Sequence, residues 1–226
     1  MSRPDKWSIL GEETVFEGGA HLRVLRQHIV TDTGRHVPDF YQVVLPDFVI
    51  ACALALDGRV LTLWQYKHGS RHYGLSFPAG HIEPGENPEL AMRRELKEET
   101  GLEAGRTIFL GRYAVNGNQQ CGFAHLFLLE GCRRVTQPDS DDLESMQLCL
   151  MSVDEINAAC ARGHIHPTVC QRLATWRRRI LHARACEMNA VTSAHLVNAS
   201  PGPIARSVPG PSFAGLVVLE LGTIDW

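Results

Sequence analysis

Residues 80–102 read GHIEPGENPELAMRRELKEETGL, a loop containing glycine and proline that runs into a helical pattern. Asn87 suits the cap of a helix whose first residue is Pro88. Gly101 suits the position just after the end of that helix. The residues able to form its buried side are Leu90, Ala91, Met92 and Leu96. The stretch therefore predicts a loop followed by a helix over about residues 88–100.

Three acids of this helix share one face. Glu95, Glu98 and Glu99 are spaced i, i+3 and i+4, which brings their carboxylates together and makes them repel one another. Cations between the acids would relieve that repulsion, and carboxylate oxygens suit hard divalent ions such as Mg²⁺ and Mn²⁺. The alternative is a solvated face paired with neighbouring basic residues, which is the commoner explanation of the charge pattern taken alone.

The residues around the acids favour the metal interpretation. The stretch fits the pattern G-x5-E-x7-R-E-U-x-E-E-x-G-U, where U is a bulky aliphatic residue, with no position missing. A chance match at one place has a probability on the order of one in 10⁹. The chain resembles the Nudix hydrolases, whose signature this is. The resemblance implies an α/β fold, a Nudix-type α/β/α sandwich with a mixed sheet, with extra antiparallel strands at the N-terminus.

The resemblance also implies a ligand set for a catalytic metal. The metal ligands would be the carbonyl of Ala79 and the carboxylates of Glu95, Glu98 and Glu99. Glu98 and Glu99 are predicted to be catalytic as well. The implied cofactor is Mg²⁺ or Mn²⁺, which would neutralise a pyrophosphate and help to activate a water.

Four further residues of the signature have predicted supporting roles. Gly80 lets the loop backbone come close to the metal and the substrate phosphates. Glu86 lies in the loop before the helix, and Arg94 can orient the acids. Gly101 ends the helix.

Residues outside the signature indicate the substrate class. The segments QYKHGS, residues 65–70, and LSFPAG, residues 75–80, resemble the ADP-ribose pyrophosphatase branch of the family. That resemblance implies hydrolysis of ADP-ribose, or a related nucleoside diphosphate sugar, to a nucleoside monophosphate and a sugar phosphate. Lys67, Arg71 and Gly80 are the predicted substrate-binding residues. Lys67 replaces the arginine usual in this branch, so a two-pronged phosphate contact becomes a point charge, and other nucleoside diphosphate sugars stay open.

A later acid is the predicted third catalytic residue. Members of this branch use an acid from a loop well after the signature, and here the run DSDDLES, residues 139–145, precedes an apolar segment. Glu144 is the predicted residue, with Asp142 and Asp141 as alternatives. A plain solvated polar loop is the other interpretation.

The rest of the chain predicts strands and two further helices. Short strands are expected within residues 7–46, a hairpin over 48–56 and 60–66, strands at 108–113 and 124–129 around a loop at 114–122, a strand at 146–151, and helices at about 152–162 and 167–184. The predicted organisation is N-terminal strands that form a dimer (1–46), a Nudix domain (47–185) and a poorly ordered extension (186–226).

Composition limits the partners and the compartment. The 226 residues hold 22 Lys and Arg against 25 Asp and Glu, so neither nucleic acid nor a membrane surface is an expected partner. No apolar run reaches the roughly 18 residues of a membrane span. Seven cysteines without a CxxC pair suggest reduced thiols and a cytoplasmic protein. The expected partners are a small-molecule nucleotide sugar and a second copy of the chain. A nucleotide-sensing module without turnover is the alternative function.

Overall fold

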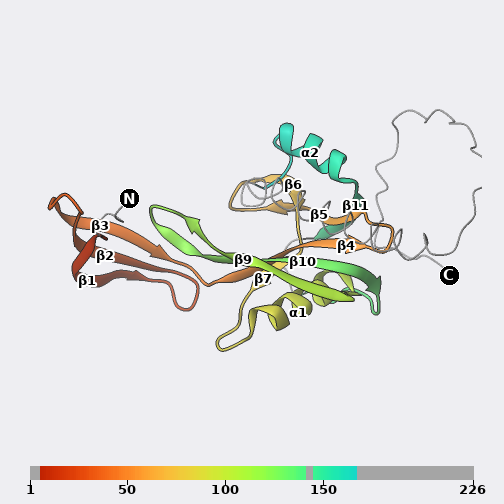
Figure 1. The fold of residues 1–226 in the computed structure, drawn as a ribbon, viewed down its shortest axis with the longest axis horizontal. Coiled ribbons are helices and arrows are strands. Elements are labelled where there is room, and N and C mark those ends of the chain that lie inside the picture. The colour runs from red at the N-terminus through yellow and green to blue at the C-terminus, as the bar shows by residue number, and fades with distance from the viewer. Residues whose placement is uncertain (1–5, 141–144, 167–226) are drawn as a thin grey trace, which may run out of the picture. The chain divides into compact units, whose positions relative to one another are not determined.

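The chain divides into two compact units in its computed structural model, which describes residues 6–140 and 145–166. The first unit comprises Met1–Leu56 and Phe77–Asp141, and the second comprises Asp57–Ser76 and Asp142–Trp226. Figure 1 labels the elements. Glu144, the predicted helix at 167–184 and the extension at 186–226 lie outside the described residues. The domain limits given above stay predictions.

The first unit is built on a mixed sheet. Its strands are β1 (Ser8–Glu17), β2 (Arg23–Val30), β3 (His36–Val44), β4 (Phe48–Ala55), β7 (Ala79–His81), β8 (Leu102–Glu103), β9 (Arg106–Asn116) and β10 (Gln120–Arg134). β1, β2 and β3 pair antiparallel in sequence order. β10 runs parallel to β4 and β3 but antiparallel to β9 and β8, and β7 pairs antiparallel with β4.

The one helix described in the first unit, α1 (Pro88–Thr100), has both predicted caps. The Asn87 side chain accepts hydrogen bonds from the backbone N–H groups of Glu89 and Leu90, at 2.8 and 3.4 Å. At the other end Gly101 is left-handed with φ of 68°, and a Cβ there would collide with the Thr136 carbonyl. The helix buries Ala91, Met92 and Leu96 and contacts β7 and β4, whereas Leu90, which was also expected on the buried side, is 62% exposed.

The second unit has a small antiparallel sheet and a helix. β5 (Val60–Lys67) pairs with β6 (His72–Ser76) and with β11 (Met146–Met151). Ser152 and Glu155 form a capping box at the start of α2 (Val153–Ala161), the helix expected at about 152–162. Val60, Leu61 and Ile156 are almost fully buried and contribute to the core of this unit.

The α/β fold class with a mixed sheet is confirmed, and two local predictions are corrected. The predicted loop at 114–122 is shorter, because β9 continues to Asn116 and β10 begins at Gln120. Gln120, Cys121 and Gly122 all have positive φ, so the start of β10 departs from the regular extended backbone of a strand. The segments β6 and β7 were not predicted as strands. No helix within residues 6–140 and 145–166 is long and apolar enough to cross a membrane.

Candidate functional site

The glycine segment β7 is fixed to β4 by backbone hydrogen bonds. Within the pairing, Val49 lies opposite Gly80 and Ile50 lies opposite Ala79. Beyond the two ends of β7, the Ala51 N–H donates to the Pro78 carbonyl at 3.0 Å and the Ile82 N–H donates to the Asp47 carbonyl at 3.1 Å. The predicted ligand Ala79 therefore lies on a short strand that pairs with β4 and is fixed by a hydrogen bond beyond each end. This position is more rigid than that of a free loop.

Two of the predicted acids lie against this segment. A Cβ at Gly80 would collide with the carboxylate of Glu95. The lack of a side chain at Gly80 therefore allows this carboxylate of α1 to lie against the segment. Glu99 is only 7% exposed, and its Oε2 accepts the Ala79 N–H at 3.1 Å. The glycine segment and the acidic face of α1 thus form one arrangement, in which Gly80 makes room for Glu95 itself.

Arg94 connects the acids of the signature. Its Nη1 donates to Glu95 at 2.8 Å and to Glu98 at 3.0 Å, and its other nitrogens donate to the two oxygens of Glu86 at 3.0 and 2.9 Å. These hydrogen bonds, led by the one to Glu86, raise the pKa of Arg94 above its ordinary value. The same contact lowers the pKa of Glu86, which keeps that carboxylate charged.

Glu86 and Arg94 also shape the loop before α1. The Glu83 N–H donates to Glu86 Oε2 at 3.0 Å, and Arg94 Nη2 donates to the His81 carbonyl at 3.1 Å. Loop and helix are therefore joined through charged groups. Such charge-assisted hydrogen bonds are roughly twice as strong as neutral ones.

The acidic face has the donor chemistry that a divalent ion needs, although its side chains are not drawn together as a ligand group. Glu95, Glu98 and Glu99 offer carboxylate oxygens and Ala79 offers a carbonyl oxygen, the donors that Mg²⁺ and Mn²⁺ prefer. Within residues 6–140 and 145–166, no cluster of three His, Cys, Asp or Glu side chains is gathered to hold a metal. Arg94 Nη1 instead bridges Glu95 and Glu98. The four predicted ligands therefore offer the oxygen donors that suit a divalent ion.

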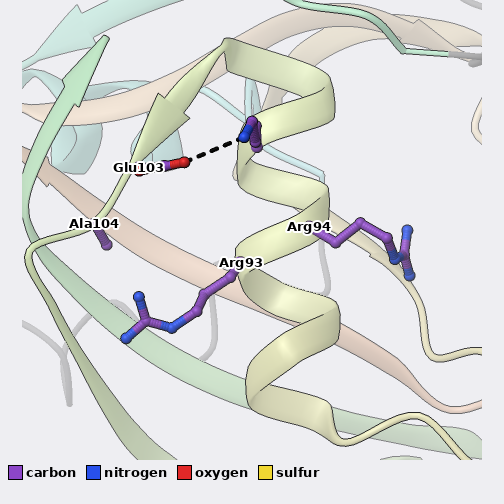
Figure 2. A pocket seen from close by; sticks show the side chains of 5 residues that line it. Arg93, Arg94, Glu103 and Ala104 are labelled. Carbon is purple, nitrogen blue, oxygen red and sulfur yellow. Dashed lines mark hydrogen bonds and ion pairs between the residues drawn. The ribbon is translucent and has the colours of Figure 1, made fainter. Parts of the chain in front are cut away.

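A second feature beside α1 is a hollow lined mainly by charged side chains. A hollow of about 290 Å³ is lined by Arg93, Arg94, Lys97, Glu103 and Ala104. Figure 2 shows Arg93 and Arg94 pointing to different sides of the helix. Lys97 pairs with Glu103 at 3.2 Å, and Arg93 pairs with Glu89 at the same distance. None of the three predicted carboxylate ligands lines this hollow.

Two of the three predicted substrate-binding residues, Lys67 and Arg71, belong to the second unit, whereas Gly80 lies in β7 of the first. Lys67 is the last residue of β5, and its carbonyl accepts the Arg71 N–H at 2.9 Å. Arg71 has φ of 57°, a conformation that a non-glycine residue adopts mainly in tight turns. Both residues therefore lie at the tip of the β5–β6 hairpin.

Asp47 was not predicted as a site residue; it immediately precedes β4 and contacts three other segments. Its carbonyl accepts the Ile82 N–H, and its side chain reaches β9 and β10. The available signal was a single carboxylate immediately before a long apolar strand. Partners 65 to 78 residues away gave no local pattern to detect.

Comparison with known proteins shows the family of this chain. A model of the NUDIX domain matches residues 46–171, more than half of the chain. The chain belongs to the NUDIX family. In this Nudix chain, the matched range contains the whole signature, the glycine segment β7, and the strand β4 and helix α1 that contact it.

Individual relatives match shorter parts of the chain. The methanol dehydrogenase activator of Bacillus methanolicus is 27% identical over 111 residues, 49% of this chain and 60% of the relative. The ADP-ribose pyrophosphatase of Bacillus subtilis (strain 168) is 29% identical over 85 residues, 38% of this chain and 46% of the relative. The Nudix chain thus spans about half the length of these curated relatives. A crystal structure described as an ADP compounds hydrolase has a TM-score of 0.67 at 19% identity, covers 81% of this chain and 98% of its own, and supports the fold.

Proposed function

We propose that this Nudix chain hydrolyses the pyrophosphate bond of ADP-ribose, or of a related nucleoside diphosphate sugar, with Mg²⁺ or Mn²⁺ as cofactor. The products would be a nucleoside monophosphate, AMP from ADP-ribose, and a sugar phosphate. The observation that carries the proposal is that Glu95 and Glu99 of the acidic face of α1 lie against the glycine segment β7. The name of the Bacillus subtilis relative supports the substrate class.

Each residue of the signature has a defined part in this proposal. Glu95, Glu98, Glu99 and the Ala79 carbonyl would hold the ion. When bound, a divalent ion offsets the charge of the diphosphate and lowers the pKa of a coordinated water. Arg94, which hydrogen-bonds Glu95 and Glu98, would keep both carboxylates charged and oriented.

Three residues outside the signature have proposed roles in the reaction. Attack of water on phosphorus needs a group that accepts its proton, and Glu144 is proposed for this role. Lys67 and Arg71 are proposed to contact the diphosphate as cations. All three assignments rest on the sequence resemblance.

The substrate panel tests the proposal. The chain, supplied with Mg²⁺, is incubated with ADP-ribose, ADP-glucose, GDP-mannose, NADH, a diadenosine polyphosphate and 8-oxo-dGTP, and the products are separated and identified by mass spectrometry. We expect kcat/KM for ADP-ribose or another nucleoside diphosphate sugar to exceed that for 8-oxo-dGTP at least about tenfold. Cleavage of the nucleoside triphosphate alone would contradict the proposed class.

A second candidate follows from the name of one relative. The Bacillus methanolicus protein is called a methanol dehydrogenase activator. The second candidate for this chain is a nucleotide-sensing module that acts on another protein, here proposed to bind without turnover. The same panel separates the two candidates. Binding of a nucleotide sugar without any released product would support the module, whereas released monophosphate would support the hydrolase.

We also propose that the strands of residues 1–46 form a homodimer. Trp7, Leu10 and Phe16, in or next to β1, are 54%, 58% and 53% exposed, and Ile9 and Val15 are exposed as well. Apolar surface of this kind on one strand favours burial against another copy of the chain. Analytical ultracentrifugation of the full chain at micromolar concentration is expected to show a dimer. Sedimentation as a monomer would contradict the proposal.

A further inference from the structure

The side chain of Asp47 joins β4 to the β9–β10 hairpin. Its Oδ1 accepts the Phe123 N–H at 3.1 Å. Its Oδ2 accepts from Arg112 Nη2 at 3.1 Å and lies 3.3 Å from His125 Nε2. The side chains of Asp47 and His125 are 32% and 11% exposed, so these contacts are shielded from water in part. The two carboxylate oxygens of Asp47, the residue immediately before β4, therefore contact three residues of the hairpin.

Arg112 is held in place by a second contact as well. Its guanidinium carbon lies 3.3 Å from the centroid of the Phe123 ring, a cation–π arrangement. Phe123 is also the residue whose N–H binds Asp47. The cluster of Asp47, Arg112, Phe123 and His125 is therefore connected through both side chains and backbone.

The cluster lies on the face of the sheet that carries the predicted metal ligands. A Cβ at Gly80 would point at the Glu95 carboxylate. Gly80 pairs with Val49, and Val49 pairs with His125, which in turn pairs with Arg112. Residues directly opposite one another on neighbouring strands have side chains on the same face. His125 and Arg112 thus project to the side of the sheet on which Glu95 lies.

The main chain of Asp47 completes the connection to the glycine segment. The Asp47 carbonyl accepts a hydrogen bond from the N–H of Ile82, which is the residue immediately after β7. Asp47 therefore contributes one of the backbone contacts that hold β7, beside the pairing of β7 with β4. We propose that Asp47 is a positioning residue for the metal site, acting through β7. This inference rests on the proposed function of the site.

Replacement of Asp47 by asparagine tests the role with little change of shape. The variant D47N keeps an oxygen for the Phe123 N–H but turns an N–H₂ group toward Arg112, which can only donate. We expect the amide of Ile82 to exchange with solvent faster in NMR hydrogen exchange, with no change at the Ala91 amide within α1. We also expect the dissociation constant for Mn²⁺, measured by titration calorimetry, to rise about tenfold, as for other residues that orient metal ligands.

A matched control separates positioning from a general loss of stability. Asp57 also accepts from an arginine, Arg59, at 2.8 Å, but it belongs to the turn after β4. The variant D57N should leave Mn²⁺ affinity and Ile82 exchange as in the wild type. If D47N does not fold, H125Q and H125L provide the test. Glutamine can donate to Asp47 from near the position of Nε2 and should keep Mn²⁺ affinity, whereas leucine should lower it.

Two outcomes would overturn the inference, and they are distinguishable from failure of the proposed function. Wild-type Mn²⁺ affinity in D47N, or unchanged Ile82 exchange, would show that Asp47 does not position the segment. A wild-type chain that neither binds Mn²⁺ nor cleaves ADP-ribose would instead contradict the proposed function. The exchange measurement needs neither metal nor substrate, so it reports on Asp47 in every case.

Discussion

Glu99→Gln is expected to lower kcat for ADP-ribose by at least about 10²-fold, the usual effect of removing a charged group that stabilises a transition state. Glutamine retains an oxygen for the Ala79 N–H, which now binds Glu99 Oε2 at 3.1 Å. The free energy of unfolding should therefore change by no more than about 1 kcal/mol. Steady-state kinetics and urea unfolding of the same preparation measure the two quantities.

The control for this variant is Glu89→Gln on the same helix. Glu89 is exposed in the first turn of α1 and pairs with Arg93 at 3.2 Å. The same loss of charge there should leave kcat within about twofold of the wild type, because surface ion pairs contribute little. An equal loss of activity in both variants, or none in Glu99→Gln, would contradict the assignment of Glu99.

Gly80→Ala is expected to lower kcat by about 10²-fold through displacement of a ligand, because small misplacements at a reacting centre cost that much. The added methyl group would occupy the space of the Glu95 carboxylate. That carboxylate is the end of a flexible side chain, so it can move aside without unfolding the chain. Activity and Mn²⁺ affinity should therefore fall much more than the free energy of unfolding does.

Gly117→Ala provides the comparison for this substitution. Gly117 lies in the tip of the β9–β10 hairpin, and a Cβ there would have no heavy atom within 4 Å. Its activity and Mn²⁺ affinity should equal those of the wild type. If Gly80→Ala also retains wild-type values, the close approach of Glu95 to the glycine segment has no functional role.

Local sequence signals were sufficient for the helix and its acids. Caps at Asn87 and Gly101 and the apolar spacing between them are short-range patterns, and the structure has the helix at Pro88–Thr100. The spacing of Glu95, Glu98 and Glu99 likewise follows from helical geometry alone. These parts of the site depend on contacts within a few residues.

Long-range contacts explain what could not be predicted. Asp47 meets Arg112, Phe123 and His125 only after β4, β9 and β10 have paired, and no local pattern announces that pairing. The three residues of β7 are too few to show the alternation of a strand, and their extended form depends on β4. The start of β10 was missed because Gln120, Cys121 and Gly122 adopt positive φ.

Hydrolysis of ADP-ribose with and without a chelator tests the central claim most directly. The chain is treated with excess EDTA, and AMP and ribose 5-phosphate are then quantified by mass spectrometry before and after addition of Mg²⁺ or Mn²⁺. We predict no products in EDTA and equal amounts of AMP and ribose 5-phosphate once the ion is restored. Full turnover in EDTA, or no turnover with either ion, would contradict the account.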